Sequence, residues 1–362
     1  MKGILALGIG FFLFSLTLQS AQVEEVKYLG WKCLKMSNST TEVYLAPEIG
    51  GRVIQYKYLG HPFLWVNKKL AGKVFPMSEN NCLENWKNYG GDKVWPAPQG
   101  WDGPGQWPGP GDEVVGAPYR AEILKKKGKY VKVRLVGSDK GGYAGVQFIR
   151  EFTLFDNSSR LYIKATMKNV TKNRQTNWGI WQVTQTDFSG PPPKTYNDKA
   201  YIIVPLNPQS IWPEKYKVMF GLAQSFNWQP DYEKMIMKIR YMNIVGKIGL
   251  DTYAGWAGLV DEQSGFCFVQ RFETFPSAEY PDNTTFTSWV AGKGYFIHKH
   301  KLMYAEDDPD SRFVEMEILS PRIKLQPGQS YSFYSSWEGH KSGLEQVPDL
   351  EKGYLPPPTT SE

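Results

Sequence analysis

Histidine and cysteine are scarce in this chain, and their scarcity limits the chemistry that it can perform. Only four histidines occur among 362 residues, so imidazole acids, bases and metal ligands are few. The three cysteines allow one disulfide bond and a free thiol, and their spacing matches neither a zinc site nor a disulfide framework. Nucleophile-elbow, phosphate-loop and dinucleotide-binding motifs are also absent. Stability must come mainly from a packed core, and we expect no metal and no bound cofactor.

Charge of one sign is not in large excess either. The 42 basic and 36 acidic residues give a formal net charge of +6, which is mild for a chain of this length. One compact basic cluster, residues 125–129, lies between two alternating runs and is typical of a solvated hairpin turn, with an acidic partner as the alternative. Because no nucleic-acid-binding motif accompanies this cluster, we predict no nucleic-acid partner.

The only long apolar run lies at the N-terminus. Lys2 precedes the apolar residues 4–18, small residues follow, and the sequence then becomes charged. This pattern predicts a secretory signal peptide over residues 1–21, cleaved near Ser20 or Ala21. The run is short for a membrane span, and no later segment is long and apolar enough. We therefore expect a secreted or periplasmic protein with no integral membrane segment after cleavage.

Alternation of polar and apolar residues with a period of two dominates the rest of the chain and predicts β-strands. Such runs cover residues 41–45, 52–56, 130–135, 160–166, 200–204, 265–270, 285–290, 312–319 and 331–336. Helical periodicity is nearly absent, and residues 231–242 fit either a short helix or a strand. We predict an all-β fold: one large antiparallel two-sheet sandwich over residues 22–350, followed by a disordered proline-rich tail at 351–362.

Residues 86–112 combine Trp86, Trp95, Trp101 and Trp107 with closely spaced glycines and prolines. Such a segment cannot be a helix and would be broken repeatedly as a strand, so we predict a long, stiff loop. An indole ring offers a flat apolar face and a polar N–H group, which suits the apolar face and hydroxyl edges of a sugar ring. The alternative is that these rings fill a core below the loop.

A second aromatic segment covers residues 178–187. If it is a strand, Trp181 and Asp187 share one face, and Gln182 and Trp178 share the other. Amide and carboxylate groups beside indole rings suit the recognition of hydroxyl groups. A core tryptophan with polar residues at the strand end is the alternative.

Two pairs of titratable residues are candidates for chemistry. His298 and His300 share one face of a predicted strand, which suits a polar groove wall or two ligands of a metal for which no third ligand is evident. Glu315 and Glu317 also share a strand face, and paired carboxylates can perform acid–base chemistry on sugars. Exposed strand faces carry such pairs for solubility as well.

Three segments carry a family resemblance: residues 47–54 (PEIGGRVI), residues 90–98 (GGDKVWPAP), and residues 315–321 (EMEILSP) followed by 325–328 (LQPG). They are similar to segments of galactose mutarotase-like (aldose-1-epimerase-like) proteins. The first resembles the opening hairpin, the second a motif of an uncharacterised, often secreted bacterial branch, and the last the closing strands. The resemblance spans roughly residues 27–337 and implies a β-supersandwich with a sugar site on its concave sheet.

The resemblance does not extend to the catalytic residues of the family. True aldose epimerases use a histidine as general acid and a glutamate as general base, because ring opening needs a proton donor at the ring oxygen and an acceptor at the anomeric hydroxyl. The region expected to carry the histidine, residues 173–182, contains none. The strand expected to carry the base, residues 286–290, contains no carboxylate. The resemblance therefore implies the fold and a sugar site without the mutarotase reaction.

These observations together predict an exported protein that binds a carbohydrate in a tryptophan-rich site. The expected stacking platforms and polar contacts are Trp95, Trp101, Trp181, Arg52, Lys93, Gln99, Gln182 and Asp187, with Lys93 suited to an acidic sugar. A polysaccharide lyase or hydrolase is the alternative, with acid–base groups drawn from His298, His300, Glu279, Tyr280 and Glu315. An epimerase with relocated catalytic groups is the third class that remains open.

Overall fold

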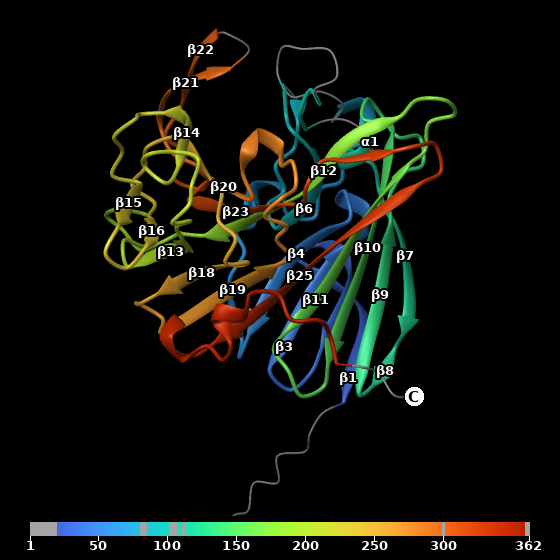
Figure 1. Ribbon diagram of the computed structural model, residues 1–362. Helices are drawn as coiled ribbons and strands as arrows, with labels where there is room; N and C mark the ends of the chain where they lie inside the picture. The colour runs from blue at the N-terminus through green and yellow to red at the C-terminus, as the bar shows by residue number, and fades with distance from the viewer. Residues whose placement is uncertain (1–19, 80–84, 101–106, 111–112, 299–300, 359–362) are drawn as a thin grey trace, which may run out of the picture.

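Antiparallel β-strands form nearly all of the regular structure in this protein (Figure 1). The computed structural model describes residues 20–79, 85–100, 107–110, 113–298 and 301–358, so most of the predicted signal peptide lies outside the described residues. The one α-helix in these ranges, α1 (Glu113–Gly116), has four residues. No helix in the described ranges has the length and apolar character needed to cross a membrane. The prediction of an all-β fold is confirmed.

Two large sheets contain most of the strands. The first sheet has the order β14 (Lys217–Gly221), β17 (Gly246–Leu250), β20 (Phe286–Val290), β23 (Phe313–Leu319), β12 (Thr176–Asp187), β6 (Asp92–Ala97), β4 (Arg52–Tyr58), β3 (Thr41–Ala46), β2 (Trp31–Ser37), β1 (Ala21–Tyr28) and β8 (Lys127–Gly128), with β24 (Ile323–Leu325) on β12 and β5 (His61–Pro62) on β4. The second has the order β15 (Trp228–Asp231), β16 (Ile236–Ile239), β13 (Ala200–Pro205), β18 (Trp256–Asp261), β19 (Phe266–Phe272), β25 (Ser330–His340), β11 (Leu161–Asn169), β10 (Val146–Phe155), β9 (Tyr130–Val136) and β7 (Arg120–Lys125).

A separate hairpin and several short helical turns complete the fold. Strands β21 (Gly294–His298) and β22 (Lys301–Ala305) pair only with each other. Turns of 3-10 helix cover Pro47–Ile49, Lys68–Leu70, Met77–Glu79, Pro281–Asn283, Leu344–Gln346 and Leu350–Lys352. In Figure 1 the hairpin projects from the body of the molecule near β14.

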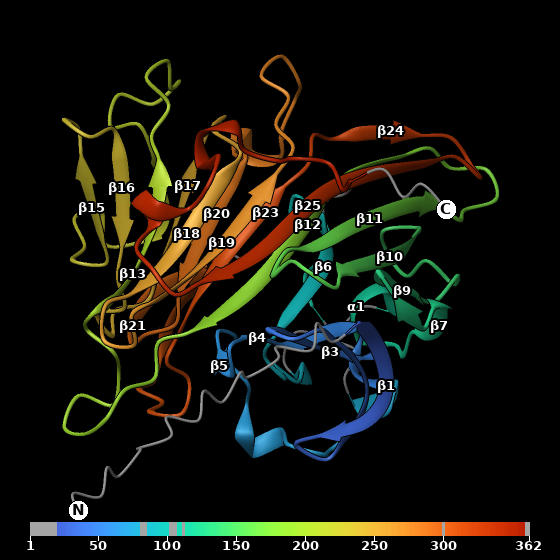
Figure 2. The ribbon, with the colours of Figure 1, turned by 90° about the horizontal axis from the view of Figure 1, so that it is seen from below.

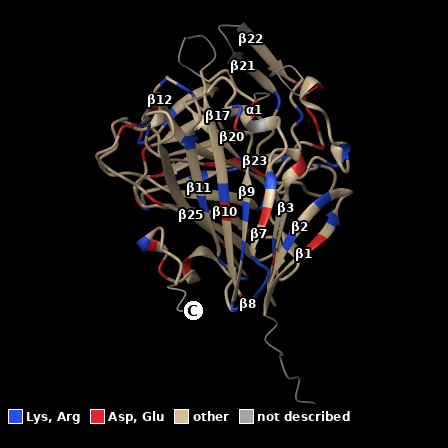
Figure 3. Cartoon of the chain, turned by 90° about the vertical axis from the view of Figure 1, so that its right-hand side faces the viewer, with Lys and Arg blue, Asp and Glu red and all other residues tan. Residues whose placement is uncertain are grey.

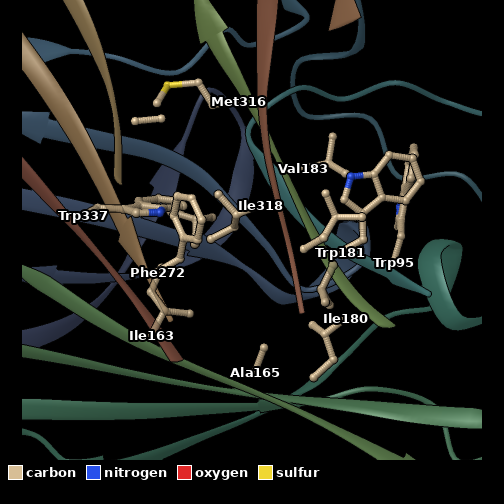
Figure 4. Close-up of a cluster of buried hydrophobic side chains, with 14 of the residues drawn as sticks. Trp95, Ile163, Ala165, Ile180, Trp181, Val183, Phe272, Met316, Ile318 and Trp337 are labelled. Atoms are coloured by element: carbon tan, nitrogen blue, oxygen red, sulfur yellow. The ribbon is translucent and has the colours of Figure 1, made fainter. Parts of the chain in front are cut away.

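The core lies between the two large sheets. Figure 2 shows β18, β19 and β25 of the second sheet stacked beside β20, β23 and β12 of the first. Ile180 of β12 and Ile318 of β23 point toward Ile163 and Phe272 of the second sheet, and all four side chains are buried (Figure 4). We call the other side of the first sheet, which faces away from the second sheet, the open face. Trp181 points to this side because neighbouring residues in a strand alternate.

The predicted strands agree with the structure where one strand face meets the core and the other meets solvent. In β9, β10 and β11, buried and partly exposed residues alternate strictly. The basic cluster at 125–129 lies between the paired strands β7 and β9, but it is not only a turn, because it contains strand β8, which pairs with β1 of the first sheet. Basic and acidic side chains are interspersed over this side of the molecule (Figure 3), where Arg134 forms ion pairs with Glu151 and Glu122.

The structure decides one open alternative and corrects one interpretation of the sequence. Residues 231–242 contain strand β16 between β15 and β13, so the strand alternative is confirmed and the helical one is excluded. Residues 86–112 are not loop throughout, because residues 92–97 form the fully buried strand β6. Strand β6 pairs with β12 along its length but with β4 only at Asp92. No residue of β4 pairs with Pro96. The N–H group that proline lacks is therefore not needed for a strand hydrogen bond on that side.

The C-terminal segment contacts the second sheet at the point where the sequence predicted a disordered tail to begin. The Arg271 guanidinium donates hydrogen bonds to the carbonyl oxygens of Pro348, Asp349 and Gly353. The Glu338 carboxylate forms an ion pair with the same guanidinium, with Arg271 Nε 2.6 Å from Glu338 Oε1. The predicted boundary at residue 351 thus falls inside a segment that contacts the second sheet, and the structure describes the chain to residue 358.

Candidate functional site

Neighbouring strands place a row of polar side chains across the open face. Thr287 of β20 lies opposite Glu317 of β23, and Glu317 lies opposite Val183 of β12. Val183 in turn lies opposite Lys93 of β6. Lys247 reaches Glu317 from β17, the strand beyond β20. Because β17, β20 and β23 pair side by side, residues far apart in the sequence meet at one carboxylate.

The Glu317 carboxylate is fully buried and accepts hydrogen bonds from three side chains. Lys247 Nζ lies 2.7 Å from Oε2 and 3.1 Å from Oε1, and Trp181 Nε1 lies 2.9 Å from Oε2. The Thr287 hydroxyl also donates to Oε2. Burial raises the pKa of Glu317 to about 7, and the nearby Glu315 charge adds to this effect while Lys247 opposes it. The Glu317 carboxyl group therefore keeps its proton to a higher pH than an ordinary glutamate.

A second ion pair lies beside the first. Lys93 Nζ is 3.2 Å from Glu315 Oε1, and the side-chain amide of Gln185 donates to the same oxygen at 2.8 Å. Burial lowers the pKa of Lys93 to about 8, because desolvation disfavours the ammonium ion. Burial would raise the pKa of Glu315, but the charges of Lys93 and Lys247 outweigh it and hold that pKa below its usual value. Lys93 and Glu315 are both buried on the same side of the sheet as Glu317, so this pair supports the neighbouring ion pair and does not line the cavity.

A cavity of about 610 Å³ lies over one end of this polar row. Trp181, Lys247 and Thr287 line it from the sheet. The lining is completed by Ala97, Pro98, Gln99, Met219, Phe220, Gly221, Asp282, Trp289, Tyr295, Phe296, Leu302 and Leu319. Its volume is within the usual range for small-molecule sites, and apolar walls with a few convergent polar groups are typical of such sites.

Aromatic rings form one wall of the cavity and part of its floor. Phe220, Trp289 and Phe296 pack together, with ring centroids 4.7 Å apart for Phe220 and Trp289 and 6.0 Å apart for Trp289 and Phe296. Lys247 Nζ lies 4.4 Å from the ring centroid of Trp181, a cation–π distance. The cavity thus presents flat apolar faces beside an ammonium group and a hydroxyl group.

Of the residues that the sequence predicted as ligand contacts, Trp181 and Gln99 line the cavity. Trp95 lies directly opposite Trp181 on the neighbouring strand, with ring centroids 5.2 Å apart (Figure 4), and it does not line the cavity. Trp95 is instead buried against Trp86 and Trp107 on the same side of the sheet, so it packs beside the cavity. Arg52 is also buried, and its guanidinium donates to the carbonyl oxygens of Ile49 and Gly90. Arg52 therefore fixes a turn rather than facing a ligand.

Gln182 and Asp187 lie away from the cavity. Gln182 points between the sheets and accepts a hydrogen bond of 2.7 Å from Ser335 of β25. Its inclusion with Trp181 in one site is wrong, because adjacent strand residues face opposite sides. Asp187 ends the same strand six residues beyond Trp181, a distance of about 20 Å along an extended chain. Its carboxylate accepts the backbone N–H of Ser189 and so caps a turn.

The proposed catalytic residues do not converge on the cavity. Glu279 is exposed and pairs with Arg322 at 3.0 Å. Tyr280 is buried and its hydroxyl accepts the Phe275 backbone N–H at 2.9 Å. Glu315 is paired with Lys93 as described above. His298 lies in strand β21 of the projecting hairpin. His300 and Trp101 lie outside the described residues.

Other groups of possible chemical importance are buried or incomplete. Among the described residues, no group of three or more His, Cys, Asp or Glu side chains is placed to hold a metal ion. Cys33 and Cys267 are free thiols buried at separate places in the fold. Burial raises the pKa of each thiol to about 12, which makes both poor nucleophiles.

The sequence analysis missed the residues that define the cavity. Lys247 is the one charged residue in the otherwise apolar strand Gly246–Leu250, and a lone charge in a buried strand is the signal that could have identified it. Glu317 was paired with Glu315 by spacing, but its neighbours Lys247 and Thr287 are fixed only by the strand order. Trp289 shares a strand face with Thr287 two residues earlier.

The fold is that of the galactose mutarotase-like proteins, and the match is to architecture rather than sequence. A galactose mutarotase-like protein from Lactobacillus casei has a TM-score of 0.54 at 11% identity, covering 85% of this chain and 100% of its own. A putative mutarotase from Salmonella typhimurium has a TM-score of 0.53 at 9% identity, and the match covers 88% of this chain and 93% of that protein. A TPR-domain containing protein from Parabacteroides distasonis has a TM-score of 0.54 at 12% identity. The match covers 90% of this chain and 49% of that protein, so this chain spans about half of that protein's length.

Sequence comparison places the chain in one family. Residues 32–339 match the model of the domain of unknown function DUF4380, and the chain belongs to that family. No curated protein matches the chain. The β-supersandwich predicted from the sequence is therefore confirmed as a fold.

Proposed function

We propose that this protein binds a carbohydrate in the cavity on the open face. The observation that carries the proposal is the placement of Lys247, Thr287 and the Trp181 ring on one side of a 610 Å³ cavity whose other wall is aromatic. A sugar ring has apolar C–H faces and a rim of hydroxyl groups. Aromatic rings can stack on those faces, while ammonium and hydroxyl groups pair with the rim.

The polar groups at the cavity floor favour a ligand rich in oxygen. Lys247 has three N–H donors, and two of its contacts go to the buried Glu317 carboxylate. Gln99 and Asp282 add an amide and a carboxylate at the cavity lining. A purely apolar ligand would cover the remaining N–H donor of Lys247 and the Gln99 amide without offering them a hydrogen-bond partner, which is costly when water is excluded. The shared architecture with mutarotase-like proteins supports the same ligand class.

Export is part of the proposal. The basic and apolar N-terminal segment has the organisation of a signal peptide, and the first strand begins at Ala21. Cleavage after Ser20 would leave this strand complete, with Ala21 buried and paired with Gly128 of β8. N-terminal sequencing of protein secreted from a host cell tests this step; a retained residue 1 would contradict it.

Ligand-observed proton NMR tests the binding proposal. Protein comprising residues 21–362 is mixed with monomers and oligomers of neutral and uronic sugars, and line broadening of a sugar identifies a ligand. Trp289→Ala should weaken that binding by about tenfold or more, since it removes one cavity wall. Tyr232→Ala is the matched control, because Tyr232 is an exposed aromatic residue outside the cavity. Broadening of no sugar, or equal binding by Trp289→Ala, would contradict the proposal.

Acid–base chemistry on the bound sugar is the second candidate, favoured by the pKa of Glu317. A carboxyl group with a pKa of about 7 can exchange protons at neutral pH, and Glu317 lies directly beneath Lys247 and Trp181. In the same NMR samples, alkenyl signals would identify a lyase, new reducing-end signals a hydrolase, and faster anomeric exchange an epimerase. Glu317→Gln should then abolish turnover while retaining line broadening.

A further inference from the structure

The hairpin β21–β22 carries large apolar side chains that face solvent. Leu302 is 69% exposed, Tyr295 is 65% exposed and Tyr304 is 48% exposed. Tyr295 and Tyr304 lie directly opposite each other on the two strands, with ring centroids 4.9 Å apart. Such a patch on a projecting hairpin is unfavourable in water unless something covers it, so exposed apolar groups of this kind mark interaction sites.

The hairpin is held against the cavity by its other face. It shares no strand pairing with the two large sheets, and a two-stranded hairpin alone is at best marginally stable. Phe296 supplies the missing support, since its ring lies 5.9 Å from Phe220 and 6.0 Å from Trp289. Phe296 and Tyr295 are adjacent in the strand and therefore face opposite sides. The same strand thus contributes Phe296 to the packed wall of the cavity and Tyr295 to the exposed patch at the cavity rim.

The exposed patch is continuous with the cavity. Tyr295 and Leu302 line the cavity and are also the most exposed of these side chains. A ligand that fills the cavity and extends outward on this side would meet Tyr295 first and Tyr304 next. Tyrosine rings provide an apolar face with a hydroxyl group at the tip, the same combination that suits a sugar ring.

We propose that Tyr295 and Tyr304 form an outer subsite for a second sugar unit, so that the ligand is an oligosaccharide or polysaccharide chain rather than a monosaccharide. This inference rests on the proposed function, because the chain is expected to enter the cavity at one end. The two rings are inclined by 57°, so they form an aromatic corner against which one sugar unit can lie. The outer subsite adds affinity only to ligands long enough to reach it.

A length series tests the outer subsite. Affinities are measured by calorimetry for galacturonate and cello-oligomers from monomer to hexamer, with the wild-type protein and Tyr304→Ala, because Tyr304 does not line the cavity. We expect the wild-type protein to bind longer members of one series at least about tenfold more tightly than its monomer. The Tyr304→Ala variant should lose most of this gain and retain the monomer affinity. Tyr232→Ala, with the same 48% exposure as Tyr304, should behave as the wild type.

The outcomes separate this inference from the proposed function. Equal binding of monomer and hexamer by the wild-type protein would overturn the outer subsite and leave the cavity as a monosaccharide site. Binding of no member of either series would overturn both. A wild-type dimer that Tyr304→Ala converts to monomer, measured by sedimentation, would show that a second copy covers the patch and would also overturn the inference. Unchanged thermal melting of Tyr304→Ala confirms that it folds.

Discussion

Removing the ammonium group of Lys247 tests the ion pair beneath the cavity directly. Lys247→Met keeps an unbranched side chain of similar length but leaves the buried Glu317 carboxylate with only Trp181 and Thr287 as donors. Removing one partner of a buried ion pair costs about 3–5 kcal/mol, because a charge remains in a low-dielectric environment. The free energy of unfolding of a typical domain is about 5–15 kcal/mol, so a loss of this size would be easily measured. We expect the free energy of unfolding to fall by about 3 kcal/mol or more when Glu317 is ionised.

The loss should depend on pH with a definite sign. A carboxyl group whose folded-state pKa lies above its unfolded value costs no stability below the unfolded pKa, and the cost grows as the pH rises from the unfolded to the folded pKa. Lys247 lowers the pKa of Glu317, so its removal should raise that pKa above the wild-type value of about 7; the difference in stability between Lys247→Met and the wild type should be largest at alkaline pH and shrink as the pH falls toward 7. The double variant Lys247→Met/Glu317→Gln removes both charges. Its loss in the free energy of unfolding should be about 2 kcal/mol smaller than the sum of the losses in the two single variants.

Urea unfolding followed by circular dichroism gives each free energy. Lys234→Met is the control, because Lys234 is exposed and should change stability by no more than about 0.5 kcal/mol. The reasoning is refuted if Lys247→Met matches this control at every pH. It is also refuted if the two substitutions at Lys247 and Glu317 are additive, since additivity would mean that the two groups do not interact in the folded protein.

Three further predictions concern the rest of the fold. Burial alone would raise the pKa of Glu338, but its contacts with His340 and the guanidinium groups of Arg160 and Arg271 lower it to about 2. Glu338→Gln should therefore cost about 3 kcal/mol near neutral pH, and this cost should vanish as the pH falls from 4.5 to about 2 in pH-dependent unfolding. In a Cys82→Ser background, Cys33 and Cys267 should react with a thiol reagent only after unfolding, as they are buried; rapid reaction of the native protein would contradict the placement. Arg271→Met should release the C-terminal segment, so limited proteolysis there should be faster than in the wild type; equal rates would show that its three carbonyl contacts are dispensable.

The strands that the sequence predicted well are those with two different environments. In β9, β10 and β11 one face packs into the core and the other meets solvent, so hydrophobicity alternates along the sequence. Strand β6 is buried on both faces and contains Pro96, so it carries no alternation and was predicted as loop. Its position depends on pairing with β12, a contact that local sequence does not encode.

The candidate site was predicted only in part because its residues meet through strand order. Trp181 was found from its own segment, whereas Lys247 and Glu317 lie 70 residues apart and meet because β17, β20 and β23 are neighbours. Alternation alone should have separated Trp181 from Gln182. It does not say which face of the strand is open, and that depends on which side the second sheet covers.

The geometry of Glu317 favours binding over acid–base catalysis. The strand expected to carry a catalytic carboxylate, β20, supplies Thr287 instead, and the carboxylate comes from its neighbour β23 in the same cross-strand row. A general base needs an accessible oxygen, but Glu317 Oε2 already accepts from Trp181, Thr287 and Lys247, and the residue is fully buried. Catalysis would require a ligand to displace one of these donors, whereas binding requires only that it contact Lys247, Thr287 and the Trp181 ring as they stand.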